Sequence, residues 1–192
     1  MGREFELKYA ATEEILDFLH RRYPHLEPIR MQTTYYDTKD GALGDLHWTL
    51  RLRMENDTAV CTLKTPGQGY GSNEWEIHCD SIDLAIPRLV EEGAPKELAE
   101  LAKGGLIQRC GASFTRLAGP IHWQDSILEL ALDKGLLLGG GKEMPLAEVE
   151  VELKQGSEAA ALDFAAGLAS ELGLKEEPRS KVARAISLTK GA

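Results

Sequence analysis

The sequence predicts an α+β domain built around a mainly antiparallel β-sheet. Most segments that alternate apolar and polar residues follow one another along the chain without a helix between them. Strands that are connected in this way pair antiparallel. Helical patterns occur at 12–23, 81–105 and 157–173, and only the first two lie between predicted strands. At 192 residues, the chain has the length of one domain.

The first segments show a strand, a helix and a second strand. Residues 3–10 alternate, with Phe5 and Leu7 on the face opposite Glu4 and Glu6. A helix follows from a Thr12 N-cap and ends before Pro24. Residues 32–38 are rich in Thr and Tyr, which favours a strand.

Three more strands are predicted before residue 81. They cover 47–55, 59–65 and 74–80, with a turn at 56–58 and a glycine-rich loop at 66–73. In each strand one face is polar. These polar faces carry Arg51, Arg53, Lys64, Glu74, Glu76 and His78.

The second half begins with helices at 81–105 that are interrupted near Pro95. Residues 113–119 and 121–126 then resemble a hairpin whose bend lies at Gly119-Pro120. Strands are predicted at 127–135 and 147–156, with a turn region at 135–144 between them. A helix follows from a Ser157 N-cap to Gly173, and the sequence predicts no definite element for 178–192.

Bulk properties restrict the function. A net charge of −9 and a pI near 5.1 argue against a nucleic-acid binder that works through bulk charge. The three cysteines, Cys61, Cys79 and Cys110, form no CxxC pair and suggest a reducing cytoplasm. There is no signal-peptide pattern and no apolar run of about 20 residues, so we expect no membrane association.

Acidic residues are segregated on several strand faces. Glu4 with Glu6, and Glu74 with Glu76, share a face, and Glu148, Glu150 and Glu152 do likewise. A solvent-facing polar surface would explain any one of these strands. However, like charges at ~4 Å repel by about 1 kcal/mol even in water. A hard divalent cation bound by carboxylate oxygens would relieve this repulsion.

Basic residues lie on strand faces of the same kind. Lys8, Arg51, Arg53 and Lys64 are joined further along by Arg116, Lys134 and Lys181. If these faces point into one concave sheet or barrel, that interior must be wet, because unpaired buried charges are too costly. A polyphosphate with Mg²⁺ would match both the acidic and the basic groups.

Short motifs resemble those of the triphosphate tunnel metalloenzymes, or CYTH superfamily. EFELK is similar to the family's N-terminal ExExK, and the motifs YYDT, LRLR, TLK, EWE, FTR, ELALDKG, EVEVELK and SKVAR follow in the expected order. The resemblance runs from Arg3 to about Leu188. It implies an eight-stranded antiparallel β-barrel that forms a tunnel, with helices around it, and a single domain over residues 1–192.

The resemblance also implies roles for individual residues. The resemblance assigns phosphate binding to Lys8, Arg51, Arg53, Lys64, Arg116 and Lys181. It assigns binding of Mg²⁺ or Mn²⁺ to Glu4, Glu6, Asp133, Glu148 and Glu150, with Glu76 and Glu152 as further candidates. Glu148, Glu150 and Lys8 are the expected catalytic residues. Lys134 should point away from Asp133 and is excluded.

Several activities occur in the family. The segments ASFTR and EVEVELKQG are most similar to the bacterial inorganic triphosphatase branch, which implies metal-dependent hydrolysis of tripolyphosphate to pyrophosphate and phosphate. The alternatives are a thiamine triphosphatase, a class IV adenylyl cyclase, or a non-catalytic module that binds polyphosphate or nucleotides. A protein nucleophile is not expected, because the sequence suggests no Cys–His or Ser–His pair. Bacterial triphosphatases of this type often carry a C-terminal helical CHAD domain, so the resemblance leaves two alternatives: this domain is absent, or it lies outside residues 1–192.

Overall fold

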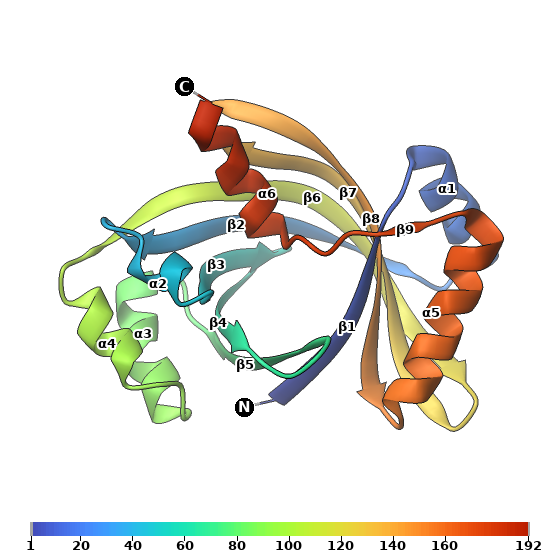
Figure 1. Ribbon diagram of the computed structural model, residues 1–192, viewed down its shortest axis with the longest axis horizontal. Coiled ribbons are helices and arrows are strands. Elements are labelled where there is room, and N and C mark those ends of the chain that lie inside the picture. The colour runs from blue at the N-terminus through green and yellow to red at the C-terminus, as the bar shows by residue number, and fades with distance from the viewer. Residues whose placement is uncertain (1, 192) are drawn as a thin grey trace.

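Eight antiparallel strands close into a barrel in the computed structural model, which describes residues 2–191 (Figure 1). The sheet order is β5-β4-β3-β2-β6-β7-β8-β1, and pairing of β1 with β5 closes it. A two-residue strand, β9 (Lys175–Glu176), adds to the end of β1. The barrel strands are β1 (Gly2–Ala10), β2 (Glu27–Thr38), β3 (Thr49–Glu55), β4 (Thr58–Pro66), β5 (Gly71–His78), β6 (Leu106–Trp123), β7 (Ser126–Gly139) and β8 (Lys142–Gln155). The predicted fold class and barrel are therefore confirmed.

Helices surround the barrel. Oxygen atoms of Thr12 and Ser157 accept backbone hydrogen bonds at the starts of α1 and α5, and Gly173 ends α5 in a left-handed conformation, as predicted. None of the helices in the described part of the chain is long and apolar enough to cross a membrane. The helices are α1 (Glu13–Arg22), α2 (Ala42–Asp45), α3 (Ile82–Glu91), α4 (Glu97–Ala102), α5 (Glu158–Leu172) and α6 (Lys181–Ser187), followed by the 3₁₀ turn η1 (Leu188–Gly191).

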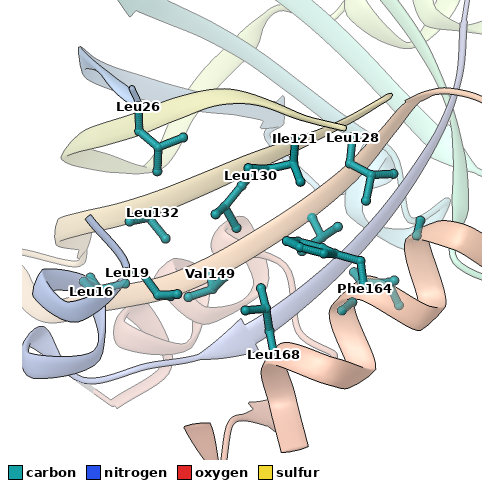
Figure 2. Close-up of a cluster of buried hydrophobic side chains, with 14 of the residues drawn as sticks. Leu16, Leu19, Leu26, Ile121, Leu128, Leu130, Leu132, Val149, Phe164 and Leu168 are labelled. Atoms are coloured by element: carbon teal, nitrogen blue, oxygen red, sulfur yellow. The ribbon is translucent and has the colours of Figure 1, made fainter. Parts of the chain in front are cut away.

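The apolar core lies mainly outside the barrel, between its wall and the helices. Leu128, Leu130 and Leu132 point outward from β7 and pack with side chains of α1 and α5 (Figure 2). A second cluster joins β3, β4 and β5 to α3 and α4. Because successive side chains of a strand point to opposite faces, this outer packing leaves the charged residues facing inward.

The predicted hairpin at Gly119-Pro120 is wrong. Strand β6 runs without interruption from Leu106 to Trp123, and the chain reverses at residues 124–125. Pairing of β6 with β2 ends at Ala118, so Pro120 pairs only with Glu129 of β7. A proline is tolerated there because no ladder hydrogen bond is required on its other side.

The turn predicted at 135–144 is much shorter than expected. Strands β7 and β8 extend to Gly139 and from Lys142, so only Gly140 and Gly141 turn. Both have positive φ, 57° and 73°, which suits a two-residue hairpin. The unassigned segment after residue 178 forms α6 and η1.

Helix α6 packs against the long strands β6 and β7, close to the end of β7 at Gly139 (Figure 1). A Cβ at Gly139 would lie 2.2 Å from the Ala185 carbonyl oxygen, so only glycine allows this approach. Ala185 is fully buried beside Phe114, Leu137 and Leu146. This packing brings the first turn of α6 to the barrel interior.

Candidate functional site

The barrel encloses a cavity of about 350 Å³ whose wall is dominated by charged side chains. Strand alternation places Arg51 and Arg53 inside, while Leu50 packs outside. The acidic lining residues are Glu4, Glu6, Glu55, Glu74, Glu76, Glu129, Glu150 and Glu152, and the basic ones are Lys8, Arg51, Arg53, Lys64, Arg116, Lys154 and Lys181. The expected concave interior with both signs of charge is present.

Three carboxylates form a buried group on one wall. Asp133 of β7 lies opposite Glu148 of β8, and Glu150 follows two residues later on the same face. Ligand oxygens of Asp133, Glu148 and Glu150 lie within 4.8 Å of one another, and all three residues are buried. We call these three residues the carboxylate triad.

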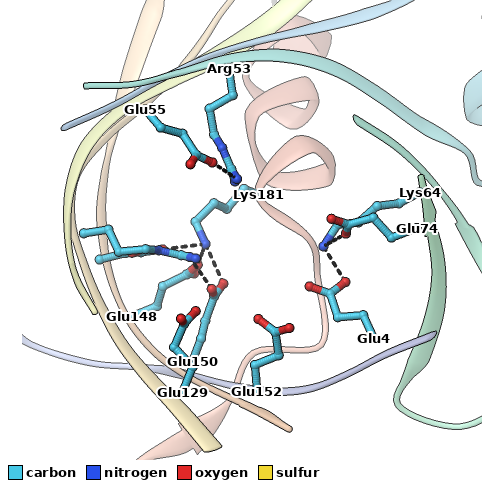
Figure 3. A network of polar contacts seen from close by, with 12 residues as sticks. Glu4, Arg53, Glu55, Lys64, Glu74, Glu129, Glu148, Glu150, Glu152 and Lys181 are labelled. Atoms are coloured by element: carbon cyan, nitrogen blue, oxygen red, sulfur yellow. Dashed lines mark hydrogen bonds and ion pairs between the residues drawn. The ribbon is translucent and has the colours of Figure 1, made fainter. Parts of the chain in front are cut away.

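Three cations surround the triad, and Figure 3 shows one of them, Lys181, beside Glu148 and Glu150. The Arg116 guanidinium donates to both Asp133 oxygens at 2.7 Å and also contacts Glu150. The Lys181 ammonium lies 2.8 Å from Asp133 and 2.6 Å from Glu150, and it also pairs with Glu148. Arg184, one turn after Lys181 on α6, pairs with the other Glu148 oxygen.

These contacts set the charge states of Glu150 and Lys181. At Glu148, burial and the charge of Glu150 outweigh the nearby cations and raise the pKa. Burial raises the pKa of Glu150, but Lys181 and Arg116 outweigh burial and hold that pKa well below its ordinary value. Burial lowers the pKa of Lys181, but the triad carboxylates reverse the shift and raise it. Glu150 and Lys181 are therefore both charged at neutral pH.

A second ion-pair group lies across the cavity. Lys64 of β4 contacts Glu4 and lies 2.9 Å from Glu74 (Figure 3). The Ser72 hydroxyl donates to the same Glu4 oxygen at 3.0 Å. Burial raises the pKa of Glu74, but Lys64 and Arg51 lower it to about 2.

Three lining residues have no ion-pair or hydrogen-bond partner for their charged groups within the described part of the chain: Glu6, Lys8 and Arg51. Burial, then the charge of Glu150, raises the pKa of Glu6 to about 7. The Arg51 Nε atom is buried without a hydrogen-bond partner among residues 2–191. An unpaired buried guanidinium is costly, and an anionic ligand would satisfy it.

The remaining lining charges pair with near neighbours. Arg53 contacts Glu55, and Lys154 lies 2.7 Å from Glu152 and 3.5 Å from Glu129. Glu76 accepts a hydrogen bond from Thr62 at 3.3 Å. These pairs are in the same cavity but outside the triad.

The predicted site residues fall into two groups. All six expected phosphate-binding residues line the cavity, as do Glu4, Glu6, Glu76, Glu150 and Glu152. Asp133 and Glu148 are fully buried behind this lining, next to Glu150. Lys134 points outward and pairs with Glu13 of α1 at 2.7 Å, as expected. The roles of these residues stay predictions.

Sequence reasoning missed Arg184, Lys154 and Glu55. Arg184 follows Lys181 by three residues in SKVAR, so helical spacing could have placed both on one face. Lys154 and Glu55 share strand faces with predicted residues, and only the barrel geometry shows that those faces extend this far along the cavity.

The carboxylates fit a hard divalent cation in the type and convergence of their oxygens. The positive charges of Arg116, Lys181 and Arg184 balance the three carboxylates of the triad. The triad by itself therefore has no excess negative charge with which to attract a metal ion. Glu6 lines the cavity near Glu150 and interacts electrostatically with it. The residues present therefore fit a metal ion best where Glu6 and Glu150 face the cavity.

A family model for the CYTH domain matches residues 2–186. The chain belongs to the CYTH domain family. An inorganic triphosphatase of Haemophilus influenzae is 29% identical over 98% of this chain, and the chain spans about half (55%) of that relative's length.

Solved structures share the CYTH fold at low sequence identity. A candidate adenylyl cyclase from Hippeastrum, described as having a dominant triphosphatase activity, superposes with a TM-score of 0.65 at 18% identity, covering 97% of this chain and 96% of that one. A protein from Pyrococcus horikoshii has a TM-score of 0.63 at 18% identity, covering 96% and 99%. A candidate adenylate cyclase from Bacillus halodurans has a TM-score of 0.62 at 20% identity, covering 94% and 96%. These likenesses support the CYTH barrel.

Proposed function

We propose that this protein is a metal-dependent triphosphatase that hydrolyses inorganic triphosphate to pyrophosphate and phosphate in the barrel cavity. The observation that carries the proposal is the convergence of seven cationic and eight carboxylate side chains on one cavity. A triphosphate with a divalent metal ion needs both kinds of group. The inorganic triphosphatase named among the relatives supports this choice of substrate.

The cations of the cavity would bind the phosphate oxygens. Arg51 and Lys8 have no carboxylate partner in residues 2–191 and can bind a phosphate without breaking an ion pair. Arg53, Lys64, Arg116 and Lys181 would each exchange or share a carboxylate contact with the ligand. Guanidinium groups suit this task because their forked donors match two phosphate oxygens.

The carboxylates would hold Mg²⁺ or Mn²⁺. We assign this role to Glu4, Glu6 and Glu150 at the cavity surface, with Glu152 and Glu76 as further candidates and Asp133 and Glu148 as the buried extension of the same wall. When bound, the metal ion supplies charge neutralisation and polarises water or phosphate oxygens.

The reaction requires positioning more than covalent catalysis. A water oxygen forms a bond to a terminal phosphorus, the bond from that phosphorus to the bridging oxygen breaks, and pyrophosphate leaves with the electron pair. The attacking water gives up one proton to the surrounding solvent, so the products are pyrophosphate, hydrogen phosphate and a proton. Lys8, Glu148 and Glu150 are our proposed catalytic residues: Lys8 and Glu150 line the cavity, while Glu148 is buried next to Glu150 and would act on the reaction through its neighbours. The cations around the cavity stabilise the charge on the leaving pyrophosphate.

We also propose that residues 1–192 act as a single domain in the cytoplasm. The cysteines Cys61, Cys79 and Cys110 are all free thiols, which agrees with a reducing compartment. Both alternatives for a CHAD domain, its absence or its location outside residues 1–192, stay open.

The test is phosphate release from tripolyphosphate with Mg²⁺, with Mn²⁺ and with EDTA, beside parallel assays with ATP and thiamine triphosphate. The proposal expects metal-dependent release that is fastest with tripolyphosphate. Faster release from thiamine triphosphate, or pyrophosphate release from ATP, would assign the alternatives. Tight binding without release from any substrate would indicate the non-catalytic module.

Variants of β8 test the residue assignment. Glu148→Gln, and Glu148→Gln with Glu150→Gln, should abolish release while tripolyphosphate binding remains detectable. Glu143→Gln on the exposed end of the same strand is the matched control. Activity that survives the double change would refute the assignment of these carboxylates.

A further inference from the structure

Arg184 is a buried arginine that does not reach the cavity. It is 6% exposed, lies on α6 one turn after Lys181, and is absent from the residues that line the cavity. Its guanidinium contacts one oxygen of Glu148, while Lys181 contacts the other. One carboxylate is therefore shared by two cations of the same helix.

The charges around the triad are balanced only when Arg184 is present. The three triad carboxylates face Arg116, Lys181 and Arg184. Glu148 is fully buried, so its carboxylate cannot turn to water if Arg184 is lost. Without Arg184, Lys181 would have to neutralise the Glu148 carboxylate alone, although Lys181 already contacts the two other triad residues.

We propose that Arg184 is a positioning residue. Because it pairs with one oxygen of the Glu148 carboxylate, it helps to neutralise that carboxylate and so leaves the Lys181 ammonium available to a phosphate in the cavity. This inference rests on the proposed function. Lys181 is the residue of α6 that brings a cation to the cavity wall. When Arg184 holds Glu148, Lys181 can exchange a carboxylate for a phosphate oxygen without leaving Glu148 as an unpaired buried charge.

The experiment is calorimetric measurement of tripolyphosphate affinity in EDTA, so that the readout does not depend on catalysis or on metal. Arg184→Gln should raise the Kd by about tenfold, and Arg184→Lys, which keeps the charge, should restore most of the affinity. Arg179→Gln is the control, because Arg179 is an exposed arginine just before α6 that pairs with Glu177. It should bind like the wild type.

A cycle through Glu148 separates positioning from simple loss of charge and remains informative if Arg184→Gln fails to fold. Glu148→Gln and Glu148→Gln/Arg184→Gln should bind tripolyphosphate equally, because both lack the ion pair between Arg184 and Glu148. Unequal binding by this pair, or wild-type affinity in Arg184→Gln, would overturn the inference. If the wild type itself neither binds nor hydrolyses tripolyphosphate, the proposed function fails first and the role of Arg184 fails with it.

Discussion

Lys181 should be the residue whose loss most disturbs the barrel interior. Its ammonium contacts all three triad carboxylates, and the side chains of Asp133 and Glu148 are fully buried while that of Glu150 is 7% exposed. Lys181→Met leaves three buried carboxylates with two arginines. Removing one partner of a buried ion pair costs about 3–5 kcal/mol of unfolding free energy. In a chain of this size, that corresponds to a melting temperature lower by about 6–20 °C.

The pH dependence of this loss identifies its cause. Lys181 and Arg116 overcome burial and hold the Glu150 pKa below its ordinary 4.5. A carboxylate with a depressed folded pKa contributes stability above its unfolded pKa, and that stability is lost as the pH falls through the folded value. The gap in stability between wild type and Lys181→Met should therefore be widest above pH 4.5 and should narrow below it.

Thermal unfolding followed by circular dichroism at pH 7.5 and at pH 4 measures both effects. Lys134→Met is the matched control, because Lys134 is an exposed lysine of β7 whose partner Glu13 is also exposed. It should melt like the wild type at both pH values. The ion-pair reasoning would be refuted if Lys181→Met melted within about 2 °C of the wild type at pH 7.5, because in a chain of this size so small a shift corresponds to a free-energy loss well below the expected one.

Three further variants test the cavity and its support. Mn²⁺ affinity, measured by calorimetry, should fall as the pH drops through about 7, because burial and the charge of Glu150 raise the pKa of Glu6 to about 7. The Glu6→Gln variant should bind Mn²⁺ weakly at every pH. Arg51→Gln should weaken tripolyphosphate binding but lower the melting temperature less than Lys181→Met, because Arg51 forms no ion pair in residues 2–191 and acts on Glu74 only at longer range. A loss of stability as large as that of Lys181→Met would contradict this. Gly139→Ala should displace α6 and weaken binding, whereas Gly104→Ala, with open space around its Cβ, should do neither.

Local patterns in the sequence were sufficient for the type of most elements. Alternation in β1, β3 and β8 predicted both the strands and their charged faces, because side chains of a strand alternate between the two sides of a sheet. Thr12 and Ser157 identified two helix starts through their capping oxygens. The hairpin at Pro120 failed because a proline signals a turn locally, whereas strand pairing decides whether its missing N–H matters.

The sequence by itself determined which residues are charged and which strand faces they occupy. Only the tertiary structure decided which of these charges meet. Glu4 pairs with Lys64, 60 positions away, and Glu148 with Arg184, 36 positions away. These pairs depend on the register of neighbouring strands, on closure of the barrel between β1 and β5, and on the close approach of α6 at Gly139. Charge type is a property of each residue, but pairing and burial are properties of the closed barrel, and they set which groups are left to bind a ligand.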